Sequence, residues 1–419
     1  MNIRSVFRSL KYPNYRLFFA GQSISLVGTW VQRMALPWLV YSQTKSVFML
    51  GFVTFMGQIP TFLLAPFAGV LSDRFNRYYM LIGLQTLAMA QAIVLAILVL
   101  TNRIELWQII ALSGLLGCIN AFDIPTRQSF VVKMVNDKAD LSNAIALNSS
   151  MVNGAKLLGP SIAGILIATV GEGYCFLINA ISYVFVILSL LLMKIGPIEK
   201  RLRKTNLFSD LKDGFSYAFG FVPICYIILL LALVSIMSMP YLVLMPVIAK
   251  EMLHGTSLTY GFLMGASGAG ALAGALYLAS RKSVLGLGEI IPMATFILSI
   301  GIIGFAFSRN VYISIAFLVI TGLGLMLQLA SSNTIIQTIV AEDKRGRVMS
   351  IYTMAFMGTA PFGSFMAGSL AKLIGASFTL LIGGLVCMAG AVLFYLKLPE
   401  IRRNVRPIYI SLGVIKEGN

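Results

Sequence analysis

The chain has 419 residues, of which 58% are hydrophobic and 11% are charged, and its formal net charge is +17. Together with a mean hydropathy of +0.88, this composition excludes a soluble globular protein and predicts a polytopic membrane protein. The positive charge does not indicate nucleic-acid binding, because no polar segment is long enough to fold as a soluble domain with a basic face.

The N-terminal segment carries several basic residues and runs directly into a long apolar stretch, which is atypical of a cleavable signal peptide. A helix that crosses the hydrocarbon core needs about 20 mostly apolar residues. We therefore predict an all-α protein with 12 transmembrane helices, at residues 16–40, 47–71, 79–101, 106–127, 143–170, 173–195, 219–250, 257–280, 289–308, 310–338, 347–372 and 375–397.

Lysine and arginine are distributed unevenly between the predicted loops. With both termini in the cytoplasm, 25 of the 32 Lys and Arg residues lie in cytoplasmic segments and five in external ones. Positively charged loops stay on the cytoplasmic side. One missed span would exchange the sides of all later loops, so this bias favours an even number of helices and cytoplasmic termini.

The longest internal polar segment, residues 196–216, lies in the middle of the chain and is predicted to be a cytoplasmic linker. It would join an N-terminal six-helix half, residues 1–195, to a C-terminal six-helix half with a cytoplasmic tail, residues 217–419. Residues 51–74 resemble residues 261–282, since both run from Gly-Phe to a charged turn. Two related halves in parallel register are typical of a rocking carrier.

A short charged turn from Gly69 to Arg77 separates the second and third predicted helices. The Asp73 carboxylate is suited to cap a helix N-terminus or to pair with a nearby arginine, and its plainer interpretation is a solvated charge. Topology alone explains Arg74 and Arg77 at least as well as a role in gating.

In the first span, polar residues recur at helical spacing and form one stripe, Gln22, Ser25, Thr29 and Arg33. Such a stripe should face the protein interior or an aqueous cavity. Arg33 lies 17 residues beyond Arg16, or ~25 Å from the cytoplasmic end of the helix. The alternative for Arg33 is that its side chain extends past Trp38 to the external interface.

The fifth span carries a second stripe, Ser149, Asn153, Lys156 and Pro160. Lys156 lies ~20 Å from the same side, at a depth similar to that of Arg33. Two cations at this depth without a carboxylate partner are costly to retain unless they are used. They favour an anionic substrate.

In the fourth span, Asn120, Asp123 and Arg127 share one helical face. Because Asp123 and Arg127 are four residues apart, a local ion pair at the cytoplasmic mouth is the plain interpretation. The alternative is that Asp123 is a proton site, since it is the one acidic residue near the membrane interior in the N-terminal half.

Small residues and proline in the fifth span, Gly154, Gly159, Pro160 and Gly164, predict close helix packing and a bend. By pseudo-symmetry, the opposite wall of a central cavity would be lined from the tenth and eleventh spans by Gln328, Ser332, Asn333, Gln337, Tyr352 and Thr353.

No catalytic or metal-binding constellation is visible. The four cysteines are widely spaced, and the single histidine, His254, falls in a predicted external loop. We expect no cofactor, no metal and no enzymatic activity, because a membrane enzyme would need a catalytic group of residues that is absent here.

The turn Gly69-xxx-Asp73-Arg74-xx-Arg77 resembles the G-x-x-x-D-R-x-x-R/K signature of the major facilitator superfamily. Further motifs resemble a bacterial exporter branch of that superfamily, which includes enterobactin-type siderophore exporters, macrolide efflux proteins and lysophospholipid transporters. These motifs are Asp123-Ile-Pro125-Thr-Arg127-Gln128, Leu141-Ser-Asn143-Ala144, Asn148, and Gly154-xxxx-Gly159-Pro160-xx-Ala163-Gly164. The resemblance covers nearly the whole chain.

The resemblance implies two pseudo-symmetric six-helix halves and alternating access. It implies that Asp73, with Arg74 and Arg77 beside it, forms a conformational latch on the cytoplasmic side, against the start of the eleventh helix near Arg347. A Gly-Pro pair in the fifth helix is associated with export, and proton antiport is the expected energy source in this superfamily.

We therefore expect a secondary active exporter of an amphipathic anion, siderophore-like in class, that works as a monomer in the bacterial inner membrane. Its partners would be the lipid bilayer and the substrate, with no nucleic acid. Multidrug or macrolide efflux is an alternative, for which a buried acid would be expected in place of Arg33 and Lys156. A lysophospholipid flippase is another, and the duplicated halves disfavour a channel.

Overall fold

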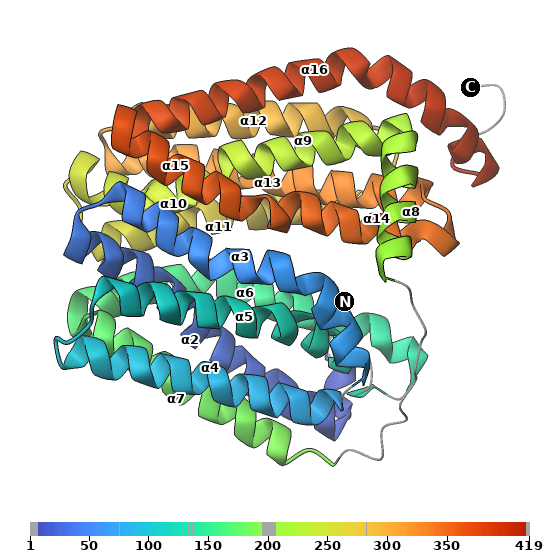
Figure 1. Ribbon diagram of the computed structural model, residues 1–419. Helices are drawn as coiled ribbons and strands as arrows, with labels where there is room; N and C mark the ends of the chain where they lie inside the picture. The colour runs from blue at the N-terminus through green and yellow to red at the C-terminus, as the bar shows by residue number, and fades with distance from the viewer. Residues whose placement is uncertain are drawn as a thin grey trace. The chain divides into compact units, whose positions relative to one another are not determined.

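The computed structural model describes residues 7–74, 76–131, 134, 135, 137–194, 207–281 and 283–415. This part of the chain is almost entirely helical (Figure 1). In chain order the elements are η1 (Arg8–Lys11), α2 (Pro13–Thr44), α3 (Val47–Arg74), α4 (Arg77–Leu100), α5 (Leu106–Val131), α6 (Lys138–Val170), α7 (Glu172–Leu191), α8 (Leu207–Gly220), α9 (Val222–Ser238), α10 (Pro240–Val247), η3 (Ile248–Met252), α11 (Ser257–Ser280), α12 (Leu287–Phe307), α13 (Val311–Ile339), α14 (Glu342–Thr353), η4 (Met354–Gly358), α15 (Ala360–Ile374) and α16 (Ala376–Ser411).

Within the described residues, 10 helical stretches are long and apolar enough to cross a membrane. The predicted runs 16–40 and 347–372 are not among them. The first forms a long helix, α2, that carries Arg33 and several amides, so its mean hydropathy is low. The second is divided between α14, a π-helical turn and α15, which begins near Pro361. The count of 12 remains a prediction.

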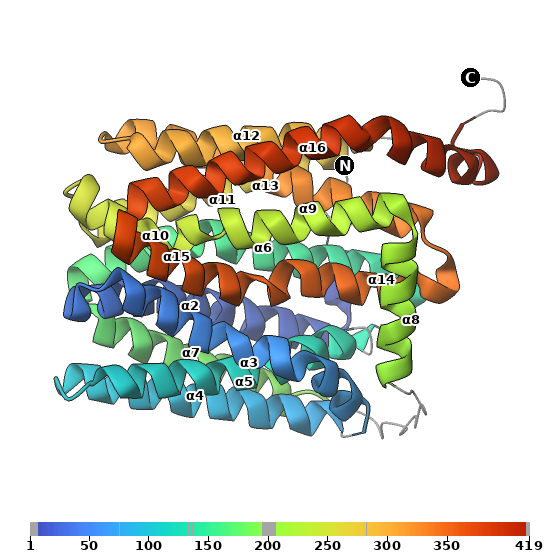
Figure 2. The ribbon, with the colours of Figure 1, turned by 45° about the horizontal axis from the view of Figure 1, so that its top comes forward.

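Two other predicted segments differ from the structure in detail. The run 219–250 is not one helix, because Pro240, which has no backbone N–H to donate, begins a new helix after α9. The second part of the predicted linker 196–216 is helical: α8 begins at Leu207 and lies across the ends of α9 and α14 (Figures 1 and 2). The first part of this linker, 196–206, lies outside the described residues.

The chain divides into two compact units. Unit 1 comprises Met1–Met49, Val53–Lys204 and Gly255–Gly265, and unit 2 comprises Leu50–Phe52, Thr205–His254 and Ala266–Asn419. The predicted division into residues 1–195 and 217–419 remains a prediction, because α3 and α11 each contribute to both units.

In unit 1, α2 packs on α6 and α7, and α4 packs on α5 and α7 (Figures 1 and 2). Aromatic and aliphatic side chains from these five helices form a continuous core, which includes Tyr15, Phe18, Leu81, Phe130 and Tyr183. Between helices in lipid, such side chains stabilise the folded state by close van der Waals packing. The core therefore holds the polar residues of α2, α5 and α6 in defined positions.

In unit 2, α12 packs against α13 and α16, and α16 against α9 (Figure 2). Glycines permit the closest approaches: a Cβ at Gly324 of α13 would lie 2.6 Å from the Ala294 carbonyl oxygen of α12. Small residues at helix contacts are typical of proteins whose helices associate in lipid by close packing.

Large apolar side chains remain exposed on the outer faces of the helices. On α7 they recur at helical spacing, at Ile181, Phe185, Leu188 and Leu192 at its end. A soluble monomer rarely leaves such a contiguous apolar stripe in water. This stripe indicates contact with lipid.

Candidate functional site: two cations and an aromatic ring on α2 and α6

The polar stripe of α2 contains buried and open positions. Gln22 and Ser25 are buried in unit 1, and Thr29, half-buried, donates a 2.9 Å hydrogen bond to the Ser25 carbonyl oxygen. Arg33, one turn further along, is exposed. The stripe is therefore anchored in the core of unit 1 at one end and open at Arg33.

The stripe of α6 is mostly open. Asn153 and Lys156 are exposed, and the Asn153 amide donates a 2.9 Å hydrogen bond to the Ser149 carbonyl oxygen. Pro160 lies within the helix and is buried. Lys156 thus presents its ammonium group to an accessible surface of unit 1.

Arg33 and Lys156 lie close enough to interact as like charges. Within the described residues, neither forms an ion pair with a carboxylate. The Arg33 guanidinium instead lies over the Trp30 ring, 5.3 Å from its centroid. The result is a pair of neighbouring cations on one wall of unit 1, with an aromatic surface beside them.

Trp30, which the sequence did not single out, is seated by a glycine of α6. A Cβ added at Gly159 would overlap the Trp30 Cβ and approach its Cγ to 2.9 Å. Gly159 is three residues after Lys156, so both occupy neighbouring positions on one face of α6. Gly159 therefore allows α2 and α6 to approach closely enough for Trp30, which the Arg33 guanidinium covers, to pack against α6 about one turn from Lys156.

The other small residues of the fifth predicted span differ from one another. A Cβ at Gly164 would lie 3.0 Å from Gly261 Cα and 2.8 Å from the Ser257 carbonyl oxygen, in the first turns of α11 that unit 1 includes. A Cβ at Gly154 would meet nothing within 4 Å among the described residues. Gly154 therefore has no close neighbour among the described residues, and its role in helix packing remains a prediction.

Tyr183 of α7 connects the cations to the acidic residue of α5. Its side chain is buried, and it lies beside Thr29 and Asn179 and within electrostatic range of Arg33 and Asp123. No spacing in the sequence links Tyr183 to Thr29, Arg33 and Asp123, because these residues come from three different helices. The packing of α2, α5 and α7 brings them together.

Asp123 is buried and has two partners. The Gln85 amide of α4 donates a 2.7 Å hydrogen bond to Oδ1, and Arg127 Nε lies 3.5 Å from Oδ2. The local ion pair predicted from the spacing is present. Asn120, one turn before Asp123, is half-buried.

A network of buried amides, which the sequence did not reveal, joins α2, α4 and α7. Asn179 donates to Gln32 Oε1 at 2.7 Å, Gln32 donates to Gln91 Oε1 at 3.1 Å, and Ser182 donates to the Asn179 carbonyl oxygen at 2.7 Å. Satisfied polar networks of this kind give a core a specific arrangement. This network holds α2 in register next to Arg33.

A second group missed from the sequence binds the N-terminal segment to the start of α6. Asp140, 3% exposed, pairs with Arg8 and with Lys11 Nζ at 2.6 Å, and it accepts a 2.9 Å hydrogen bond from the Tyr12 hydroxyl. The hydrogen bond to the Asp140 carboxylate raises the pKa of Lys11 above its ordinary value. This cluster stabilises the end of α6 from which Lys156 is positioned.

The residues predicted to line the opposite wall of a central cavity lie on α13 and α14 of unit 2, and they separate into two groups. Gln328 and Ser332 of α13 are fully buried, and their side-chain polar atoms have no hydrogen-bond partner within the described residues. Asn333, half-buried, accepts a 2.5 Å hydrogen bond from Gln337 and lies beside Tyr352. The Tyr352 hydroxyl donates to the Leu329 carbonyl oxygen at 2.8 Å.

The turn predicted to act as a latch is very short, since α3 ends at Arg74 and α4 begins at Arg77. Asp73 and Arg74 lie in the last turn of α3, and their side chains are outside the described residues. The cap of α4 is Asn76, which accepts a 3.0 Å hydrogen bond from the Tyr78 N–H. The side chain that caps α4 is thus that of Asn76, and the role of Asp73 remains a prediction. Arg347, near which the latch partner of Asp73 was predicted, has its Nη1 atom 3.6 Å from Oδ2 of Asp213 in α8.

Two helical units with lipid-facing outer surfaces and charged side chains held within a long-helix bundle define a multi-pass membrane transporter. A family model described as transmembrane secretion effector matches residues 4–409. The chain belongs to this family, within the major facilitator superfamily.

The chain is 26% identical over 383 residues to the staphyloferrin A transporter of Staphylococcus aureus, covering 91% of this chain and 95% of that protein. It is 21% identical over 392 residues to macrolide efflux protein A of Streptococcus pyogenes, covering 90% and 96%. A crystal structure of a bacterial homologue of the human lysosomal transporter Spinster superposes with a TM-score of 0.73 at 12% identity, covering 94% and 98%. The first relative is described as a transporter and the second as an efflux protein. The crystal structure supports the fold.

Proposed function

We propose that this protein is a secondary active exporter of an amphipathic anion, siderophore-like in class, that works by alternating access between two six-helix halves with cytoplasmic termini. The pair formed by Arg33 and Lys156 carries this proposal. Two neighbouring cations repel each other, and an anion between them replaces that repulsion with two attractive contacts. The similarity to the staphyloferrin A transporter supports this substrate class.

The neighbouring Trp30 ring suits the amphipathic part of the proposed substrate. It offers a flat apolar surface next to the cationic groups. The polar side chains at hand, Thr29, Asn120 and Asn153, are suited to accept and donate hydrogen bonds that orient a polar ligand. In unit 2, Gln328, Asn333 and Tyr352 are proposed as further binding residues.

A transport panel tests the proposal. Inverted membrane vesicles containing the full chain would be offered anionic siderophores, lysophospholipids, a macrolide and cationic dyes, with and without a pH gradient. We expect vesicles that contain the protein to take up more of the anionic siderophores than vesicles without it. Transport of the cationic dyes alone would contradict the proposal, and transport of the lysophospholipids alone would favour the flippase.

Macrolide or multidrug efflux is the second candidate. The buried carboxylate of Asp123 and the similarity to macrolide efflux protein A favour it, because a buried acid is suited to a cationic drug. Asp123 is already matched by Arg127 and Gln85. For this reason we place the anionic substrate first.

We also propose that Asp123 is the proton-coupling residue. In Asp123→Asn the residue can no longer bind or release a proton, so a pH gradient should no longer accelerate uptake, while exchange of labelled for unlabelled substrate continues. Vesicle uptake with an imposed pH gradient measures the acceleration, and counterflow measures the exchange of labelled for unlabelled substrate. Glu105→Gln, a change at an exposed acid before α5, is the control and should leave both unchanged. Full gradient-driven uptake by Asp123→Asn would exclude this role.

Asp73 is proposed as a conformational latch, a contact made in one state of the transport cycle. Asp73→Asn should increase access from the cytoplasmic side. In a chain without its native cysteines, Asn153→Cys supplies a labelling site, and we expect Asp73→Asn to raise its labelling severalfold in inverted vesicles. Glu400→Gln, which removes one partner of an exposed i, i+3 pair, is the control. Equal labelling with and without Asp73→Asn would contradict the latch.

A further inference from the structure

The basic end of α16, in unit 2, borders two cavities that adjoin each other. The first encloses about 650 Å³ and is lined from α9, α12, α13 and α16. The second encloses about 620 Å³ between α12 and α16. Glu289, Leu398 and Arg402 line both. The first cavity, which arginines border, is the basic end of the site described here, and the second, lined mostly by apolar side chains, is its apolar end.

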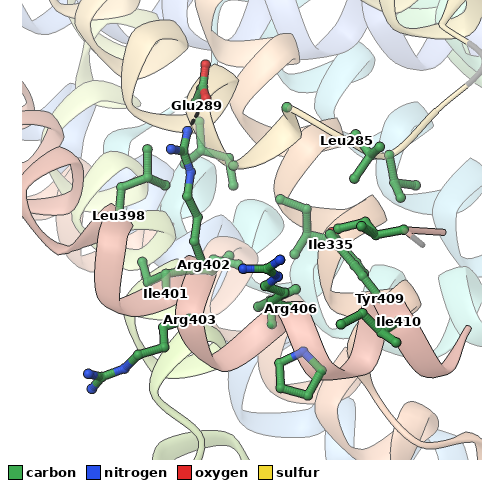
Figure 3. A pocket seen from close by; sticks show the side chains of 18 of the residues that line it. Leu285, Glu289, Ile335, Leu398, Ile401, Arg402, Arg403, Arg406, Tyr409 and Ile410 are labelled. Carbon is green, nitrogen blue, oxygen red and sulfur yellow. Dashed lines mark hydrogen bonds and ion pairs between the residues drawn. The ribbon is translucent and has the colours of Figure 1, made fainter. Parts of the chain in front are cut away.

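The basic end carries three arginines of α16, Arg402, Arg403 and Arg406, against one carboxylate, Glu289. Figure 3 shows Arg402 extending to Glu289, with which it pairs, and Arg406 lying along the lining between Arg402 and Tyr409, whereas Arg403 points away. Beneath the arginines the floor is made of buried apolar side chains, among them Ile291 and Ile335.

The apolar end is a groove on the outer surface of α12 and α16. Its lining includes Met293, Phe296, Val392 and Tyr395, all of which are exposed large hydrophobic residues. In a membrane protein such a surface is in contact with acyl chains. The groove leads from this surface to the arginines.

The length of α16 places the junction near the membrane interface. The helix has 36 residues, about 54 Å at ~1.5 Å per residue, whereas the hydrocarbon core is ~30 Å thick. Its predicted membrane span ends at residue 397, so Arg402, Arg403 and Arg406 follow within three turns. Basic pockets between helices at the cytoplasmic leaflet are suited to anionic lipid headgroups.

We propose that this space is a binding site for an anionic phospholipid of the membrane, with an acyl chain in the groove between α12 and α16 and the headgroup phosphate at Arg402 and Arg406. The shape and chemistry of the site match the two parts of such a lipid: the groove is apolar, and at the basic end the Arg402 and Arg406 guanidinium groups are of the kind that binds phosphate oxygens. The site is separate from the proposed substrate site on α2 and α6, and the proposal goes beyond transport.

Native mass spectrometry of the delipidated full chain tests the proposal, with phosphatidylglycerol, phosphatidylcholine and inorganic phosphate as probes. We expect one phosphatidylglycerol to be retained at least fivefold more tightly than phosphatidylcholine. Arg406→Gln should weaken its retention about fivefold, because one basic side chain near an anionic membrane surface contributes about 1 kcal/mol. Lys397→Gln, the same loss of charge on the same helix but outside both linings, should have no such effect.

A second, matched pair of variants keeps the test independent of the arginines. Leu285 lines the basic end and is 40% exposed, so polar substitutions there should not disturb folding. Leu285→Glu should weaken phosphatidylglycerol retention about fivefold, whereas Leu285→Gln should not.

Three results would overturn the proposal. The first is equal retention of the two lipids, and the second is competition by inorganic phosphate at the same concentration as the lipid, which would indicate an anion site alone. The third is binding only after removal of residues 412–419, because Ile415 also lines the first cavity and the end of the chain would then be its occupant.

Discussion

Replacement of Arg33 and Lys156 together by glutamine is expected to abolish uptake of anionic siderophores into inverted vesicles. Each cation makes a charge-assisted contact with the proposed substrate, and such contacts contribute about 1.5–3 kcal/mol. Each single variant should therefore reduce apparent affinity by about tenfold or more. Initial rates over a range of substrate concentrations measure the effect.

Three controls separate substrate binding from folding. Lys45→Gln removes an exposed charge just after α2 and should leave transport unchanged. Lys156→Arg keeps the positive charge and should keep most of the activity. Expression and thermal stability of the double variant in detergent should match those of the unmodified protein, because both side chains are exposed. Undiminished anion uptake by the double variant would rule out this pair as the anion site.

The same substitution at two glycines of α6 is expected to have opposite effects. Gly159→Ala places a Cβ against Trp30, so α2 and α6 must separate or the ring must move. Overpacking of this kind costs about 1–3 kcal/mol, and it displaces Trp30 from its position beside Arg33 and Lys156. We expect a lower thermal midpoint in detergent and a large loss of transport.

Gly154→Ala, on the same helix, is the matched control. The position is open, since a Cβ there meets nothing within 4 Å among the described residues. Alanine favours a helix over glycine by up to about 1 kcal/mol, so this variant should be as stable as the unmodified protein or more so, and active. If Gly159→Ala were equally stable and active, the contact with Trp30 would not be what positions the site.

The sequence predicted some features of the site because they depend on local geometry alone. Helical spacing is sufficient to place Asp123 next to Arg127, and the structure contains that pair. In the same way, the spacing of Thr29 and Arg33 predicted one polar face on α2. The family motifs indicated the superfamily, which the family match now shows.

The rest depends on contacts between segments that are far apart in the chain. Three glycines and a proline in α6 were predicted to serve close packing and a bend, yet Gly159 lies against Trp30 while Gly154 is open among the described residues. The difference is set by which face of α6 meets α2, and no periodicity within α6 contains that information. The buried amides Gln32 and Asn179 are 147 residues apart, and they too meet through packing alone.

By itself, the sequence determined the class of this protein. Apolar runs of membrane length, a strong bias of Lys and Arg between loops, and the charged turn ending at Arg77 are properties of composition and order, and each has a direct physical meaning in a bilayer. The tertiary structure decided which polar groups act together. It seats Trp30 on Gly159, brings Arg33 within electrostatic range of Lys156, and sets the arginines of α16 beside a groove on α12. The reason is that helices lying side by side bring together residues that the sequence keeps apart.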